Sequence, residues 1–211
     1  PGIALSSFAA CLLLLFYLGT LAQSKSPFWG ILITQWLLIL LPPLVFCWLA
    51  RVRLRPALSL YAPAPLASAG AALVTVGWLL LMLQLSVWQG RWMPMPDDMA
   101  AQMQALTQTI EEHTGLVGLI IVVALSPAVC EEILFRGVVL SGLRTRLPMW
   151  AGIMLVGVLF GLLHLSVFKL IVTSLSGTVL AYLVWRSGSL YLGMAAHFSI
   201  NATSLLLRPG F

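Results

Sequence analysis

Long apolar stretches separated by short polar ones make up most of the chain. Each stretch is near the length of about 20 residues that an α-helix needs to cross a bilayer. Between them lie Pro, Gly, Ser and Arg clusters of the kind that end helices. The pattern predicts an all-α, polytopic transmembrane bundle of about seven spans, near residues 2–23, 28–50, 66–89, 116–143, 149–167, 169–186 and 189–207.

The longest polar segment, residues 96–114, predicts one further helix of a different kind. Asp97 and Asp98 stand where a helix start favours negative charge. Apolar side chains then recur on one helical face, at Met99, Met103, Leu106 and Ile110. We expect an amphipathic helix packed on the membrane surface, in preference to a lid over a site.

Composition supports a membrane protein and excludes several other classes. The chain is 61% hydrophobic and 8% charged, whereas a soluble domain carries about 25% charged residues. This excludes a soluble globular domain, a disordered tail and a nucleic-acid-binding domain, and predicts an integral, multi-pass protein of a cell membrane if the source is bacterial. Its partners are then the lipid bilayer and membrane-bound molecules, with no nucleic acid.

The net charge of +5 fits Lys and Arg in loops that face anionic lipid. With seven spans, six arginines fall on one side: Arg51, Arg53, Arg55, Arg144, Arg146 and Arg186. The other side holds Lys25, Arg91, Lys169, Arg208 and four acids. The positive-inside rule then predicts a cytoplasmic N-terminus. Cys11, Cys47 and Cys130 have no metal-binding spacing and are expected to be buried thiols.

Two adjacent carboxylates fall inside an apolar span. Glu131 and Glu132 lie at membrane depth, where ionisable groups are costly and usually functional. Arg136 follows Glu132 by four residues, so the two share a helix face and can form an ion pair. Glu131 points elsewhere without a local partner, and a desolvated carboxylate of this kind suits a general base or acid. Pro127, one turn earlier, is expected to bend the helix.

Two further apolar spans carry imidazole and amide groups at membrane depth. His164 follows Phe160 by four residues, and Asn201 follows His197 by the same spacing. Each group alone is more typical of a hydrogen bond between helices. Together with the carboxylates and the arginine, they are better explained by one shared site. Gly157 and Gly161 predict that another helix approaches closely just before His164.

The three motifs Glu131-Glu132-x-x-x-Arg136, Phe160-x-x-x-His164 and His197-x-x-x-Asn201 resemble those of the CAAX protease and bacteriocin-processing family, which includes the type II CAAX prenyl endopeptidases. The resemblance covers residues 115–207. It divides the chain into residues 1–114, with N-terminal transmembrane helices and the amphipathic segment, and residues 115–211, a catalytic helical core.

The resemblance implies a glutamate-dependent intramembrane endopeptidase that cleaves a membrane-associated substrate, of which a prenylated CAAX-type protein is one candidate. Glu131 with His164 would polarise the attacking water, and His197 with Asn201 would form an oxyanion hole. Glu132, Arg136 and Phe160 would support these groups. No cofactor is expected.

Three alternatives to a glutamate-dependent peptidase also fit the sequence. A zinc protease would use Glu131, His164 and His197 as ligands, although no HExxH sequence is present. A serine protease would pair Ser176 with His197 but would leave Glu131 unexplained. A proton-coupled transporter, or an immunity or scaffold protein on the same fold, would also use intramembrane Glu, His and Arg, although a proton path has no need of a His197–Asn201 pair.

Overall fold

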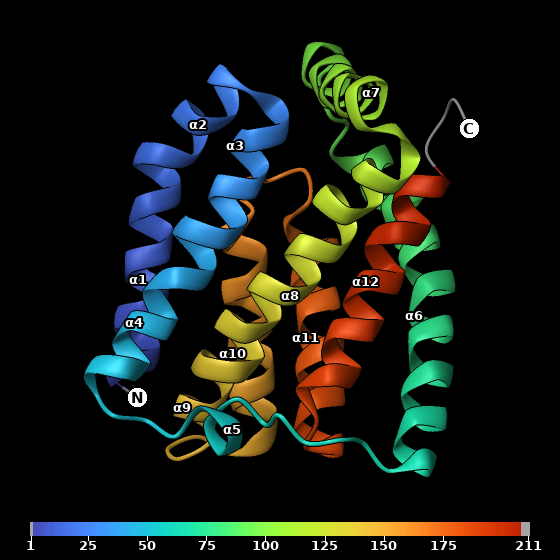
Figure 1. Cartoon of the computed structure of the whole chain (residues 1–211). Coiled ribbons are helices and arrows are strands. Elements are labelled where there is room, and N and C mark those ends of the chain that lie inside the picture. Colours follow the sequence, from blue (N-terminus) through green and yellow to red (C-terminus); the bar gives the residue numbers. More distant parts are fainter. Residues whose placement is uncertain (1, 208–211) are drawn as a thin grey trace.

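Helices form all the secondary structure that the computed structural model describes, over residues 2–207. Arg208, assigned from sequence to a loop, lies outside this range. Most helices run between the two ends of the bundle in Figure 1, while α7 lies across the top and the segment carrying α5 crosses the bottom. The predicted all-α bundle is therefore confirmed.

Two continuous helical segments form an N-terminal hairpin (Figure 1). The first comprises α1 (Gly2–Leu14), the π-helical η1 (Leu15–Gly19) and α2 (Thr20–Lys25). The second comprises α3 (Pro27–Ile33), the π-helical η2 (Thr34–Leu40) and α4 (Leu41–Leu49). Between them the Ser26 hydroxyl accepts a hydrogen bond from the Trp29 amide, and Pro27 occupies the first helical position, so the second helix begins there.

π-helical stretches precede the prolines of two spans. Stretch η2 ends just before Pro42 and Pro43, and η3 (Ile121–Leu125) ends just before Pro127. Proline removes an amide donor and crowds the carbonyl one turn earlier, and a wider turn accommodates that conflict. The irregularity expected at Pro127 is thus a local change of helix type.

Three helices follow the hairpin: α5 lies at the bottom of the bundle, α6 flanks its other side and α7 covers its top. Helix α5 (Leu54–Ala57) lies in the crossing segment, and α6 (Pro65–Trp92) then packs against α11 and α12. Helix α7 (Asp97–Ile120) contains the predicted amphipathic part and turns at Gly115, where φ is 68°. Glycine adopts this conformation without steric cost, so the chain changes direction there before it enters the bundle.

The remaining helices carry the three sequence motifs. They are α8 (Ser126–Glu132), the π-helical η4 (Ile133–Leu140), α9 (Ser141–Leu143), α10 (Met149–Leu163), α11 (Leu170–Ser187) and α12 (Leu190–Leu206). The largest buried apolar cluster joins the N-terminal hairpin to α8, η4 and α10, with Phe135 and Ile153 fully buried. The hairpin is therefore part of the core that supports the motifs.

Five helical segments within residues 2–207 are long and apolar enough to cross a membrane: Gly2–Lys25, Pro27–Leu49, Pro65–Trp92, Asp97–Leu143 and Leu170–Ser187. The other two predicted spans correspond to the shorter α10 and α12, so seven helical segments stand where spans were expected. Large apolar side chains such as Leu66 (86% exposed) and Trp48 (75% exposed) face outward. This surface suits lipid, and the chain is an integral multi-pass membrane protein.

Candidate active site

The two adjacent glutamates and the arginine are buried in the centre of the helical bundle. Glu131 is 6% exposed, Glu132 is 0% exposed and Arg136 is 1% exposed. They lie where α8 continues into η4, a segment that contacts the N-terminal hairpin, α10 and α12. Their charges are thus enclosed by other helices instead of facing lipid, as expected for functional ionisable groups.

Glu132 connects Arg136 to His197. Its Oε1 lies 2.7 Å from an Arg136 guanidinium nitrogen, as the four-residue spacing predicted, and 3.0 Å from His197 Nδ1. A second guanidinium nitrogen of Arg136 donates to the Gly177 carbonyl at 2.8 Å, and its Cζ lies 4.6 Å from the Phe160 ring centroid. These contacts fix the arginine and orient the His197 ring, with Nδ1 facing the carboxylate.

Glu131 has a partner that sequence reasoning missed. Gln35, on η2 of the N-terminal hairpin, donates from Nε2 to Glu131 Oε1 at 2.9 Å. The other carboxylate oxygen, Oε2, lies 4.0 Å from His197 Nε2 and has no hydrogen bond within residues 2–207. Gln35 is a lone amide in the apolar segment 28–50, and that isolation is the one sequence signal that could have identified it.

The four predicted catalytic residues, Glu131, His164, His197 and Asn201, line one cavity of about 680 Å³. Phe160 lines it as well and contacts both imidazole rings, with centroid distances of 4.9 Å to His164 and 5.6 Å to His197. Residues from α6, α7, α8, α10, α11 and α12 contribute to the walls. The fold thus brings the three motifs to a single cavity.

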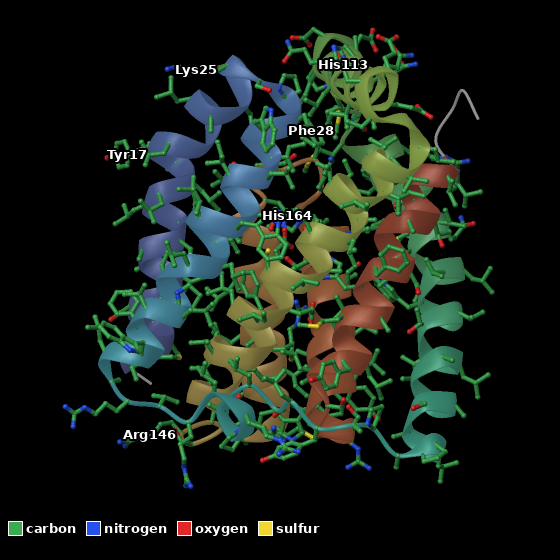
Figure 2. All side chains as sticks on the ribbon, in the orientation of Figure 1. Tyr17, Lys25, Phe28, His113, Arg146 and His164 are labelled. Carbon is green, nitrogen blue, oxygen red and sulfur yellow. The ribbon has the colours of Figure 1, made fainter. Side chains whose placement is uncertain are left out.

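The position of His164 differs from the sequence prediction, which extended this span to residue 167. Helix α10 ends at Leu163, and His164 stands at its C-terminus below the level of Lys25 and His113 (Figure 2). Leu165 has a φ of 49°, a left-handed conformation that costs about 1–2 kcal/mol in a residue with a side chain. This turn stops the helix and leaves His164 at the cavity.

The protonation of His164 follows from its hydrogen bond. Its Nδ1 lies 2.9 Å from the Phe160 carbonyl, which can only accept. Nδ1 therefore carries the proton, and Nε2 is the atom left to contact a molecule in the cavity.

Small residues let the motif helices approach closely, as Gly157 and Gly161 predicted. A side-chain carbon on Gly157 would lie 2.7 Å from the Ser174 carbonyl oxygen of α11. On Gly193 of α12, such a carbon would lie 2.7 Å from Glu132 Oε2. Because these positions lack a side chain, α11 packs tightly on α10 and α12 reaches Glu132.

The alternative zinc ligands do not form a compact cluster. Within residues 2–207, no three His, Cys, Asp or Glu side chains are grouped closely enough to hold a metal ion. Glu131, His164 and His197 thus do not fit a zinc site in this arrangement, and no reaction step is derived through one.

Ser176, the nucleophile of the serine-protease alternative, also lines the cavity. Its hydroxyl oxygen accepts a hydrogen bond from Trp78 Nε1 at 3.1 Å. That contact gives Ser176 a structural partner on α6.

Comparison with known proteins agrees with this arrangement. Residues 113–203 match the model of the family described as type II CAAX prenyl endopeptidase Rce1-like. No curated protein and no solved structure matches the chain. The matched residues include all three motifs and begin at the end of the amphipathic part of α7. Residues 113–203 of the chain, which carry all three motifs, are therefore similar to the Rce1-like type II CAAX prenyl endopeptidase family of membrane proteases.

Proposed function

We propose that the protein is an intramembrane endopeptidase in which Glu131 and His164 activate a water molecule for peptide hydrolysis. The observation that carries this proposal is one cavity lined by Glu131, His164, His197 and Asn201. The Glu131 oxygen without a hydrogen bond and, in a neutral His164 ring, the Nε2 atom are both acceptors for a water molecule. Amide hydrolysis needs such a base together with donors for the oxyanion that develops.

Glu131 Oε2 and His164 Nε2 take the hydrogen bonds of the water, and Glu131 receives its proton as the oxygen attacks the carbonyl carbon. The same proton then passes to the departing amine, so the carboxylate is restored. Gln35 keeps the other oxygen of Glu131 in place during both transfers.

His197 and Asn201 stabilise the tetrahedral intermediate in this proposal. Glu132 accepts from His197 Nδ1, so a doubly protonated His197 donates from Nε2, and Glu132 balances its charge. The Asn201 amide supplies a second donor from the same helix face. Enclosure by apolar helices strengthens both hydrogen bonds, because little water competes for the oxyanion.

The apolar walls of the cavity suit a lipid-modified peptide. Four methionines, Met82, Met93, Met95 and Met103, line the side formed by α6, α7 and the segment between them. Methionine side chains are flexible and adapt to irregular apolar shapes. We propose a CAAX-type substrate, in which a lipid on cysteine lies against these side chains and a short C-terminal tail is released.

Conservative variants of the proposed base test this mechanism. Glu131→Gln keeps the size of the side chain but removes its basicity, so cleavage of a prenylated CAAX-type peptide in detergent should fall by about 100- to 10,000-fold. His164→Ala should cause a comparable loss. Glu112→Gln, an exposed carboxylate on α7, is the matched control and should cleave at the wild-type rate. If Glu131→Gln cleaves the peptide at the wild-type rate, Glu131 is not the base.

A strong chelator distinguishes this mechanism from the zinc alternative. Purified protein dialysed against chelator is expected to keep its full cleavage rate, since no proposed step uses a metal. Loss of cleavage that returns on adding Zn²⁺ would instead assign Glu131, His164 and His197 to a metal site.

A further inference from the structure

The cavity contains one cationic side chain that the proposed chemistry does not use. Four residues with titratable side chains line it: Glu131, His164, Lys169 and His197. Three of them have roles in water activation or oxyanion binding. Lys169 lies in the short connection between α10 and α11, five residues after His164.

A buried glutamine fixes the backbone that carries Lys169. Gln89 of α6, 6% exposed, donates from Nε2 to the Phe168 carbonyl, and its Oε1 accepts from the Val172 amide at 3.3 Å. The Lys169 carbonyl accepts from the Thr173 amide and hydroxyl at 2.9 Å and 2.8 Å. Backbone on both sides of Lys169 is therefore held, and the lysine occupies a defined place in the cavity wall.

Among the residues that the structure describes, the ammonium group of Lys169 has no acidic partner. Within residues 2–207, none of the ion pairs includes it. Burial lowers the pKa of Lys169 below the usual lysine value, which shows that the surrounding side chains penalise its charge. A half-buried, unpaired cation is unfavourable, and an anion bound beside it would offset that cost. Lys169 also precedes α11, whose N-terminal end adds a positive dipole.

We propose that Lys169 binds the free C-terminal carboxylate of the peptide substrate. This inference rests on the proposed function, because a bond close to the C-terminus is cut only if the terminal carboxylate enters the same cavity. Lys169 is thus a specificity residue that selects chain ends over internal segments of a protein. A carboxylate is the anion that such a substrate always carries there, whatever its final side chain.

Two peptides that differ only at the C-terminus test the assignment. One is a prenylated CAAX-type peptide with a free carboxylate, and the other is the same peptide with a carboxamide. For the wild type, we expect kcat/KM to be about 10- to 100-fold higher for the acid, the range of a hydrogen bond to a charged group. In Lys169→Met, the two peptides should be cleaved at similar rates.

Two control variants separate the charge of Lys169 from its effect on folding. Lys169→Arg should keep the preference for the acid, and so should Lys25→Met, which removes an exposed cation outside the cavity. The ratio is measured within each preparation, so a partly unfolded sample does not change it.

The possible results separate the two proposals. An unchanged ratio in Lys169→Met, or equal loss of cleavage for both peptides, would overturn the role of Lys169 but leave the proposed peptidase. Wild-type protein that cleaves neither peptide would instead contradict the peptidase itself.

Discussion

Glu132 is the residue on which the buried charges depend. One of its oxygens contacts both Arg136 and His197, and the side chain is fully buried. Contacts from a guanidinium and an imidazole to one carboxylate offset the cost of removing these groups from water, provided that none is lost. The sequence indicated the pair with Arg136 through its spacing. It could not indicate His197, which lies 65 residues further along the chain.

Replacing Glu132 by Ala should destabilise the protein by about 3–5 kcal/mol, because Arg136 would remain buried without its carboxylate. Unfolding by denaturant in detergent micelles measures this change. Glu112→Ala, at an exposed site, is expected to change the free energy of unfolding by less than about 0.5 kcal/mol. Similar stabilities of the two variants would show that the buried pair contributes little.

Gln35 should act on the rate of the reaction through Glu131. In Gln35→Leu the carboxylate loses its only hydrogen-bond donor within residues 2–207, so we expect kcat to fall about 10-fold with a smaller change in KM. Trp36→Phe is the matched control, because it removes a hydrogen bond from the neighbouring residue to Ser126 and not to Glu131. Equal effects of the two variants would assign Gln35 a structural role alone.

At the scale of helices, sequence periodicity predicted most segments and missed their irregular parts. Hydropathy predicted where the spans lie, because burial in lipid depends on composition over about 20 residues. The left-handed turn at Leu165 and the change of direction at Gly115 depend on backbone angles that hydropathy does not record. For the same reason, the predicted span 149–167 extended past the actual helix end at Leu163.

The amphipathic part of α7 shows a second feature that periodicity could not predict. Its apolar face was expected to pack on the membrane surface, whereas in the structure Ile110 is buried against the N-terminal hairpin and α12. The structure adds that Met103 and Thr107 of the same helix line the cavity. Periodicity identified the apolar face but could not say that part of it covers a cavity.

Close packing of α10 on α11 gives a prediction about glycine. A methyl group on Gly157 would collide with the backbone of α11, so Gly157→Ala should destabilise the protein by about 1–3 kcal/mol. Gly77 on α6 has open space around it, and Gly77→Ala should leave stability unchanged or raise it by up to about 1 kcal/mol. Thermal unfolding of both variants in detergent makes the comparison, and a stable Gly157→Ala protein would contradict this packing.

At the scale of the whole molecule, the cavity draws on both halves of the chain. The division at residue 115 remains a prediction, and the family match begins close to it at residue 113. However, Gln35 of the first half supports Glu131, and α6 and α7 supply cavity walls. Such contacts between distant residues leave no periodic signal, so the sequence indicated the chemical groups of the site but not the walls around them.

The two ends of the bundle also differ in charge. Arg146 lies at one end in Figure 2, and Lys25 and His113 lie at the other. The Arg-rich connections before α5 and after α9 share the Arg146 end in Figure 1, in keeping with the predicted grouping of arginines. The cytoplasmic assignment of that end stays a prediction.

Mass spectrometry of the cleavage products is the most direct test of whether the protein is a CAAX-type peptidase. Purified wild-type protein is incubated with a prenylated peptide ending in a CAAX-type sequence. A CAAX-type peptidase is expected to release a three-residue tail and leave a product that ends at the prenylated cysteine. An intact peptide after prolonged incubation with folded protein would contradict it.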